Sequence, residues 1–483
     1  MSVSRWLLAL AVALAAALGA RVAAAEPEDG LHFRPDLAWR SGDHQVEVSL
    51  AGRYRFESWD ARARRHDGFH GLRTRLATRY TFRDVIAAFA EAQHVALWGL
   101  SARSSGAAAL YRRQTSGGDA TDADELRLRQ LYLELDLSGA MLRAGRQNLN
   151  FGTTVRYDDP DWRYLKLKRL SQRLVGTVGW THVERAYDGL SAVASPLAGH
   201  SVHLFAARPT TGVFDVERGY RRQDDIGVAG VDWTVQRGTW LEHSELRAFG
   251  IAYQDTRDGR DGGLAGDVEV YTLGASLLSL HPVGPGRIDV LAWVAAQWGD
   301  FPGTGGRDLD HLAAAGVAEI GYRLGDFPAR PWLRVGVNAA SGDDDPNDGD
   351  HGTFFNLLPT NHLYYGYADQ LAFQNLVDLI VQLKLEPFPG AGLELSWHRF
   401  WLVDDRDARY FGTGAFSTSA FGFGSTPSNN SKDVGHELDV VASYPLHRSV
   451  NLSAGYAYFW GGRVFGSSRR DTEWVFAQIR FAY

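Results

Sequence analysis

The last eleven residues of the chain alternate between apolar and mixed positions up to an aromatic carboxy terminus. One parity is entirely apolar and comprises Val475, Ala477, Ile479, Phe481 and Tyr483. The other parity carries Gln478 and Arg480, preceded by Trp474 and Phe476. A strand of about nine to eleven residues with one apolar face suits the wall of a transmembrane β-barrel. A soluble β-sandwich could end in the same way, so this segment alone leaves both folds open.

The amino-terminal segment favours the barrel. Residues 1–25 have the features of a secretory signal peptide, with Arg5 before an apolar run and three alanines before Glu26. That run is too short for a membrane helix, and no later stretch approaches the required length of about 18 apolar residues. The chain contains no cysteine, which argues against a disulfide-stapled domain and a cysteine-anchored lipoprotein. We therefore expect residues 26–44 to form a periplasmic segment and 45–483 a barrel.

Strands counted backwards from Tyr483 total about eighteen, which places both termini on the periplasmic side. The predicted strands cover residues 45–57, 71–81, 86–100, 126–137, 140–146, 184–194, 200–206, 226–236, 241–253, 268–280, 287–298, 312–324, 330–340, 373–385, 391–402, 434–444, 450–461 and 473–483. Short turns rich in Pro and Gly alternate with long polar loops between them. The predicted fold is an all-β, transmembrane, antiparallel up-and-down barrel in the outer membrane of a Gram-negative bacterium.

Composition and motifs exclude several other classes. The net charge of −7 argues against a nucleic-acid partner. The acidic segment 343–350 looks like a calcium loop, but Pro346 occupies a ligand position, so we expect a solvated loop and no metal site. No nucleophile motif such as Gly-x-Ser-x-Gly occurs. We expect no enzyme activity and no cofactor.

The segment 358–370, Leu-Pro-Thr-Asn-His-Leu-Tyr-Tyr-Gly-Tyr-Ala-Asp-Gln, resembles the signature of the alginate-export family of outer-membrane proteins. Further similar blocks lie at 142–147, 185–189, 396–402, 435–439 and 454–459. The resemblance implies an eighteen-stranded barrel that passes an anionic polyuronate. It also implies interior residues, namely Arg73, Arg75, Arg127 and Arg146, with Asp188 as an acidic partner. Alginate exporters have a long periplasmic lid between the sixteenth and seventeenth strands, whereas this chain has only 444–448 there.

Polar-parity residues predict an uneven charge distribution around the pore. The first, second and last strands supply a basic stripe of Arg53, Arg55, Arg73, Arg75, Arg79 and Arg480. The fourth and the fourteenth to sixteenth strands supply acidic residues, with Lys384 as an exception: Glu134, Asp136, Asp378, Glu394, Glu437 and Asp439. Such a transverse field orients dipolar solutes and tunes ion selectivity. Alternatively, these charges only pair with one another and select nothing.

Two local features leave undecided which residues line the pore. The longest connection, 147–183, holds basic and acidic residues together and would constrict the pore if it folds inward, or lie in solvent if it folds outward. The fourth strand breaks its alternation at Arg129 and Gln130, which suggests a β-bulge and leaves the directions of Arg127 and Arg129 undecided.

The sequence therefore predicts a passive outer-membrane channel of alginate-export type for an anionic or polar carbohydrate, polysaccharide or other hydrophilic solute. The alternatives are a general diffusion porin with weak ion selectivity and no export role, or a plugged barrel such as an adhesin. Expected partners are outer-membrane lipid, lipopolysaccharide and the barrel assembly machinery, whose carboxy-terminal recognition signal the last strand resembles. We expect a monomer.

Overall fold

A closed ring of antiparallel strands forms the protein. The computed structural model describes residues 37–60, 67–101, 106–114, 122–257, 266–303, 307–412, 423–466 and 471–483. The predicted signal peptide and residues 26–36 lie outside the described residues. Within these ranges the wall consists of eighteen strands: β2 (His44–Asp60), β3 (Asp67–Phe82), β4 (Ile86–Trp98), β5 (Ala123–Leu137), β6 (Ala140–Gln147), β7 (Tyr187–Ala194), β8 (His200–Pro209), β9 (Ile226–Val235), β10 (Ser244–Asp255), β11 (Val268–Val283), β12 (Gly286–Pro302), β13 (Asp308–Leu324), β14 (Trp332–Ala340), β16 (Leu376–Leu385), β17 (Gly392–Trp401), β20 (Asp433–His447), β21 (Val450–Gly461) and β22 (Thr472–Ala482).

The smaller elements lie in the connections between wall strands, except β1 (Ala38–Ser41), which precedes β2. The others are β15 (Asp350–His351), β18 (Ala408–Tyr410), β19 (Ser425–Pro427), α2 (Gly106–Gln114), α3 (Pro160–Tyr164), the π-helical turn η2 (Leu165–Leu170) and the 3₁₀ turns η3 (Asn361–Leu363) and η5 (Arg463–Phe465). Among the described residues no helix is both long and apolar enough to cross a membrane. The prediction of an all-β, eighteen-stranded barrel is confirmed, with strand bounds close to those expected.

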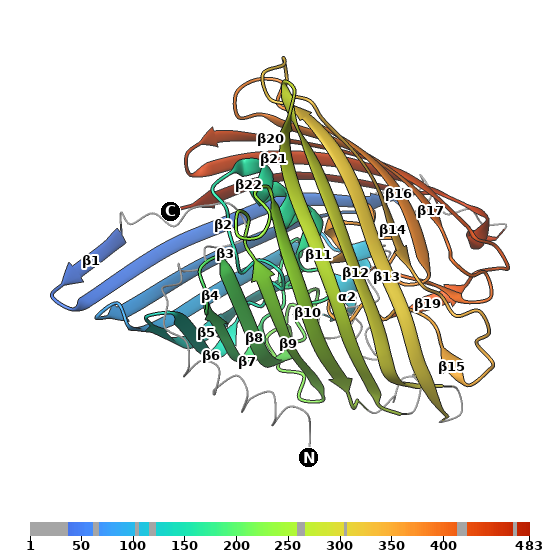
Figure 1. Cartoon of the computed structure of the whole chain (residues 1–483), viewed down its shortest axis with the longest axis horizontal. Helices are drawn as coiled ribbons and strands as arrows, with labels where there is room; N and C mark the ends of the chain where they lie inside the picture. The colour runs from blue at the N-terminus through green and yellow to red at the C-terminus, as the bar shows by residue number, and fades with distance from the viewer. Residues whose placement is uncertain are drawn as a thin grey trace.

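The first and last wall strands close the ring. β2 and β22 pair antiparallel from Ala51↔Ala482 to Asp60↔Glu473. The sheet therefore has no free lateral edge at its seam, and Figure 1 shows the strands running around one continuous wall. β1 folds back on β2 through Ala38↔Glu47, so the pairing already begins within the segment predicted to precede the barrel.

The two ends of the barrel differ in their connections. At one end, here called the turn end, short turns join neighbouring strands, as between β5 and β6 at Ser138 and Gly139. The other end, here called the loop end, carries long connections, which include 148–186, 341–375 and 402–432. β2 begins and β22 ends at the turn end. The alternation of short and long connections follows the sequence-based prediction.

Burial alternates along the strands in the sense expected for a membrane wall. In β13, Leu312 is 75% and Ile320 56% exposed on the outer face, whereas Glu319 on the opposite parity is 4% exposed. The interior face buries charged groups completely, among them Arg55 and Asp378. A water-soluble barrel would show the reverse pattern, with apolar side chains inside. Sequence parity alone could not separate these two cases.

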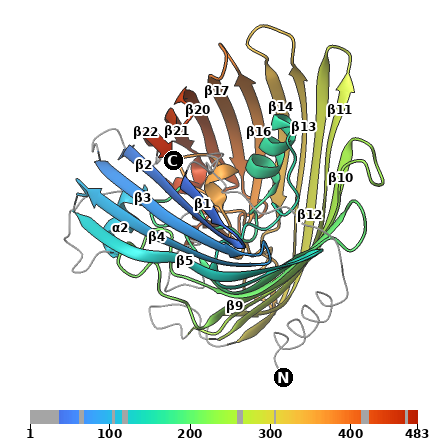
Figure 2. The same cartoon turned by 90° about the vertical axis from the view of Figure 1, so that its left-hand side faces the viewer.

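Two long connections occupy the interior of the barrel. Figure 2 looks into the ring of strands and shows helical turns of the β6–β7 and β14–β16 connections within it. The two connections join through a parallel bridge between Val175 and Leu358. Leu358 N–H donates to the Leu174 carbonyl at 2.9 Å, and Gly176 N–H donates to the Leu358 carbonyl at 2.9 Å. Two connections that are far apart in the sequence therefore pack together inside the barrel.

Because Leu133 of β5 lies on the outer face of the barrel, the effect of replacing it can be predicted. Leu133 is 61% exposed in the middle of an apolar stripe, so Leu133→Arg should lower the free energy of unfolding by about 2–4 kcal/mol in a bilayer. The measurement is denaturant unfolding of protein folded into phospholipid vesicles. Leu241→Arg, in the β9–β10 turn, is the control and should have little effect. Equal tolerance of both substitutions would contradict the assignment.

Candidate functional site in the barrel interior

The β6–β7 connection, residues 148–186, descends inside the barrel. Asp159 caps the start of its helix α3, and the Asp159 carboxylate accepts a hydrogen bond from the backbone N–H of Asp161 at 2.9 Å. Arg287 of β12 contacts Asp159 at 2.8 Å, and Arg323 of β13 pairs with Asp161. Both arginines lie near the turn end, so the loop crosses much of the barrel height. Of the two directions that the sequence left open, the loop takes the inward one.

Farther along the same loop, arginines bind a carboxylate of the wall. Arg169 donates through Nε and Nη2 to the two oxygens of Glu319 at 3.0 and 2.7 Å. Arg334 of β14 contacts Glu319 at 2.8 Å, and Arg173 lies 3.6 Å from it. The bidentate contact fixes the orientation as well as the position of the loop.

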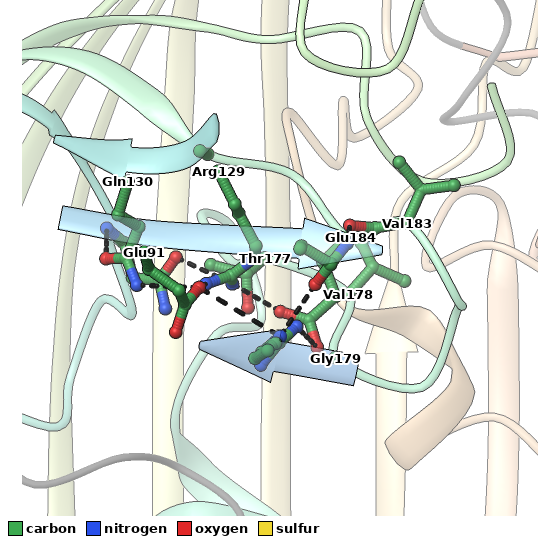
Figure 3. Close-up of polar contacts among 12 residues, drawn as sticks. Glu91, Arg129, Gln130, Thr177, Val178, Gly179, Val183 and Glu184 are labelled. Carbon is green, nitrogen blue, oxygen red and sulfur yellow. Dashed lines mark hydrogen bonds and ion pairs between the residues drawn. The ribbon is translucent and has the colours of Figure 1, made fainter. Parts of the chain in front are cut away.

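Glu184, near the end of the loop, binds three arginines of the wall. Arg75 contacts its carboxylate at 2.7 Å, and Arg73 and Arg129 pair with it as well. Arg129 also donates to Glu91 at 2.6 Å, and Figure 3 shows Glu184, Arg129 and Glu91 converging. Burial alone would raise the pKa of Glu184, but the three guanidinium groups hold that pKa below its ordinary value. The carboxylate is therefore ionised at neutral pH.

A β-bulge lets Arg129 take part in this cluster. The register between β4 and β5 shifts between Glu91 and Ala92, so Arg129 has no partner of its own in the ladder. Gln130 stands opposite Glu91 and donates to it at 3.3 Å. Both Arg129 and Gln130 consequently reach the interior. The parity break predicted at these two residues is confirmed as a bulge.

Arg53 and Arg55 of β2 hold the backbone and an aromatic side chain of the loop. Arg53 donates to two loop carbonyl oxygens, including that of Thr181 at 2.7 Å. Arg55 donates to Glu57 at 2.7 Å, and its guanidinium carbon lies 3.7 Å from the ring centroid of Trp180. The predicted basic stripe therefore exists on the interior face, but the inward loop covers much of it.

The β14–β16 connection packs against the predicted acidic wall. Ala368 N–H donates to Glu437 at 2.8 Å. Gly366 has a φ of +86°, and a Cβ there would lie 2.5 Å from the Glu437 carboxyl group, so only glycine fits this contact. His398 Nε2 lies 3.7 Å from Asp439. Glu437 and Asp439 are both buried beneath the connection.

Two other acidic residues of this wall also have partners. Glu394 accepts a hydrogen bond from the Tyr164 hydroxyl of the inward loop at 3.2 Å. The Lys384 ammonium, the basic exception in this wall, lies 2.8 Å from the Tyr164 ring centroid. Asp378 accepts from Asn338 at 3.0 Å. Both acidic residues therefore accept hydrogen bonds from neutral side chains, Tyr164 of the inward loop and Asn338 of β14.

The remaining interior assignments follow from pairing and register. Glu134 pairs with Arg79 and, at 2.6 Å, with Arg143, and Asp136 shares the parity of Glu134. Arg480 stands opposite the interior residue Arg53 across the closing seam. Arg127 stands opposite Gln93, whose side chain contacts the inward loop, and pairs with Glu125 at 2.7 Å.

The prediction of Arg146 and Asp188 as interior residues is wrong. Arg146 stands opposite Leu131, which is 52% exposed on the outer face, and Asp188 stands opposite Arg146. Arg146 donates to both Asp188 oxygens, at 2.7 and 2.8 Å. The two residues were assigned to the interior from a family motif, without regard to the alternation of side chains along the strand. By that alternation, Arg143 of the same strand faces inward instead.

Several interior residues were not singled out from the sequence. On β9 to β14 the interior parity carries charges that the alternation of those strands could have identified: Asp232, Glu245, Arg247, Asp289, Glu319 and Arg334. Lys166 of the inward loop donates to Glu245 at 2.8 Å. The role of Glu184 had no local signal, because its three partners lie 55 or more residues away. In the described residues no three His, Asp or Glu side chains are placed to hold a metal ion.

Cavities lie beside the inward loops in the part of the chain that the structure describes. One of about 260 Å³ lies between the β6–β7 loop and the strands near the seam. Its lining includes Arg53, Arg480 and Lys168, with Glu394 and Trp180. A second cavity of about 880 Å³ opens among the connections of the loop end and is lined by aromatic residues and by Asp343 and Asp407. The smaller cavity brings cationic, anionic and aromatic groups around one solute-sized volume.

Comparison with known proteins relates the whole barrel to outer-membrane proteins. A family model described as "Alginate export" matches residues 44–473. No curated protein matches the chain in sequence. The outer membrane protein OpdK of Pseudomonas aeruginosa is similar in structure, at 12% identity and a TM-score of 0.57 over 90% of this chain and 99% of that one. OccAB2 of Acinetobacter baumannii gives 11% identity and a TM-score of 0.59 over 91% and 98%. At such identities the structures establish the common fold alone.

Removing the Glu184 carboxylate should loosen the inward loop. Glu184→Gln leaves three buried guanidinium groups without their shared anion, so the free energy of unfolding should fall by about 3–5 kcal/mol. Denaturant titration in detergent or vesicles measures this change. Glu242→Gln, at a carboxylate 88% exposed at the turn end, is the matched control. A loss no larger than that of the control would contradict the central role of Glu184.

The lowered pKa of Glu184 also predicts a pH dependence. Its ion pairs contribute fully above the ordinary glutamate pKa of about 4.3, and this contribution is lost as the pH falls through the lower folded-state pKa. The stability difference between the wild type and Glu184→Gln should therefore be constant from about pH 8 to about pH 5 and shrink in more acidic solution. Unfolding titrations of both proteins across this range provide the measurement. A difference that already shrinks between neutral pH and about pH 5 would be inconsistent with the lowered pKa.

Proposed function

The chain belongs to the alginate export family, and on that premise we propose that it is a passive outer-membrane channel for a small anionic or polar carbohydrate or a similar hydrophilic solute. Family membership and the closed barrel support an outer-membrane channel for hydrophilic solutes. The turn end, with both ends of the ring, faces the periplasm in this proposal, and the loop end faces outward. No catalytic role is part of it.

The cavity near the seam is the observation that supports a small anionic or polar carbohydrate as the solute. Its volume of about 260 Å³ is smaller than the roughly 300–1,000 Å³ of most small-molecule pockets. Arg53, Arg480 and Lys168 supply positive charge, Glu394 supplies a carboxylate, and Trp180 supplies an aromatic surface. A carboxylate-bearing sugar could contact all three kinds of group. Charged groups of opposite sign also orient a polar solute in transit.

The inward loops favour a selective channel over a general diffusion porin. A general porin keeps a wide water-filled lumen, whereas here the 148–186 and 341–375 connections meet inside the ring. The connection between β20 and β21 is also short, since His447 already pairs with Val450. In the described chain no lid follows β20, which supports passage of a small solute rather than dedicated export of a polymer.

Single-channel recording in planar bilayers tests the proposal. The wild type should conduct, and a monomeric uronate should block its ion current more strongly than the corresponding neutral sugar. The double variant Arg53→Gln/Arg480→Gln should lose this preference and shift the reversal potential in a salt gradient toward cation selectivity. Arg330→Gln, at an exposed turn-end arginine, is the control and should retain both properties.

Other outcomes would point elsewhere. Conductance without any preference between uronate and neutral sugar would favour the general diffusion porin. An absence of conductance in both directions of applied voltage would favour a plugged barrel.

A further inference from the structure

A row of charged residues lies on the outer face of the barrel between β6 and β8. Register places Arg146 opposite Asp188, and Asp188 opposite Arg208. Arg208 in turn donates to Asp224 at 3.2 Å, and Arg222 donates to Asp224 at 2.5 Å. The row therefore alternates in sign along its length. Its outward direction follows from the exposed leucines that share the face, including Leu131, Leu133 and Leu190.

Part of this row lies within the height expected for hydrocarbon. Arg146 is six residues above Ala140, where β6 leaves the turn end. At about 3.3 Å per residue and a tilt of about 40°, it stands roughly 15 Å above the turn. The outward apolar band of such barrels is about 25 Å tall. β6 and β7 contain only eight residues each, so these two strands end at about this height.

The aromatic girdle is interrupted in the same sector. Toward the loop end, the outer face carries Trp98 stacked on His70 at the β3–β4 pair, and Tyr271 stacked on Trp298 at the β11–β12 pair. Aromatic side chains at these heights mark the boundary between lipid and water. Between these pairs, the described outward residues near the loop ends of β5 to β10 are charged, polar or small, or are Leu126. At its loop end this sector therefore lacks the aromatic side chains that mark the boundary between lipid and water.

Hydrocarbon is an unfavourable cover for this surface, because an outward arginine within the band costs up to about 2–4 kcal/mol. A phosphorylated lipid headgroup would require an excess of positive charge, whereas Arg146 and Asp188 already balance each other. A protein surface with the same alternating charges would keep Arg146 out of contact with hydrocarbon, and its binding would require no excess of positive charge. Small side chains beside the row, Ala144 and Ala206, allow such a surface to approach closely.

We propose that the outer face of β6 to β8 docks a second copy of this chain. Two copies in one membrane share their up-and-down sense, so a closed pair needs a two-fold axis along the membrane normal. With that axis between β6 and β7, Arg146 of each copy faces the partner subunit's Asp188. The row is thus complementary to itself. This inference replaces the sequence-based expectation of a monomer, and it rests on the membrane location but not on the identity of the solute.

Single-cysteine cross-linking tests the interface directly, because the natural chain contains no cysteine. Ala144→Cys places one thiol on the outer face of β6 and leaves the ion pair intact. Oxidation in intact outer membranes should convert most of this variant into a covalent dimer. Ala318→Cys, an exposed outward alanine of β13 far along the ring, is the matched control and should remain monomeric. Equal, low cross-linking at both positions would overturn the proposal.

Charge exchange provides a second, independent measurement. Asp188→Arg should dissociate the dimer in native mass spectrometry from mild detergent, and Arg146→Asp/Asp188→Arg should restore it because the pairs re-form in reverse. If Ala144→Cys fails to cross-link and Arg146→Gln instead loses co-purifying lipopolysaccharide, the row is a lipid-headgroup site and the proposed interface is wrong. Channel conductance of the variants, measured in parallel, separates failure of this proposal from failure of the proposed function.

Discussion

Pairing between β2 and β22 closes the barrel, and the burial pattern and the interior contacts follow from that closure. A bilayer offers no hydrogen-bond partners, so a sheet can cross it only when every strand edge is paired by closure. Closure turns one face of every strand toward lipid and the other toward a confined interior. It also brings Arg53 and Arg480, which are far apart in sequence, into direct register. The inverted burial pattern, with exposed leucines and buried arginines, is a consequence of this arrangement.

The confined interior is filled by charge pairing rather than by an apolar core alone. The inward loops bring Glu184 to the arginines of β3 and β5, and Arg169 to Glu319 of β13. Buried ion pairs give limited net stability, because desolvation offsets their attraction, but breaking one is costly. Their main physical effect here is therefore to specify where the loops lie. Because of this pairing, much of the interior charge contacts the protein itself, and the cavity near the seam still presents Arg53, Arg480 and Glu394.

A residue's environment could be predicted from the sequence where it follows from strand parity. It could not be predicted where it depends on contacts with residues far away in the sequence. Arg53, Arg75 and Glu437 contact the interior connections, on the face that alternation predicts, because alternation is a local property; their role as pore-lining residues stays a prediction. Arg146 was misplaced because a family motif was followed in preference to parity. The bulge at Arg129 was visible as a break in alternation, yet its partner Glu184 was not foreseeable, since the direction of the 148–186 loop is set by contacts with six or more strands.

The strand count and the alternation of turns and loops could be read from the sequence, because periodicity and turn chemistry are encoded within short windows. The family could be recognised from the resemblance of motifs such as 358–370. The folded barrel was needed to show that the longest loop folds inward, that the basic stripe binds that loop, and that the ion pair of Arg146 and Asp188 faces outward. Each of these depends on which groups become neighbours after closure. Electrostatic interactions act between spatial neighbours, and spatial neighbours at large sequence separation are a property of the closed barrel alone.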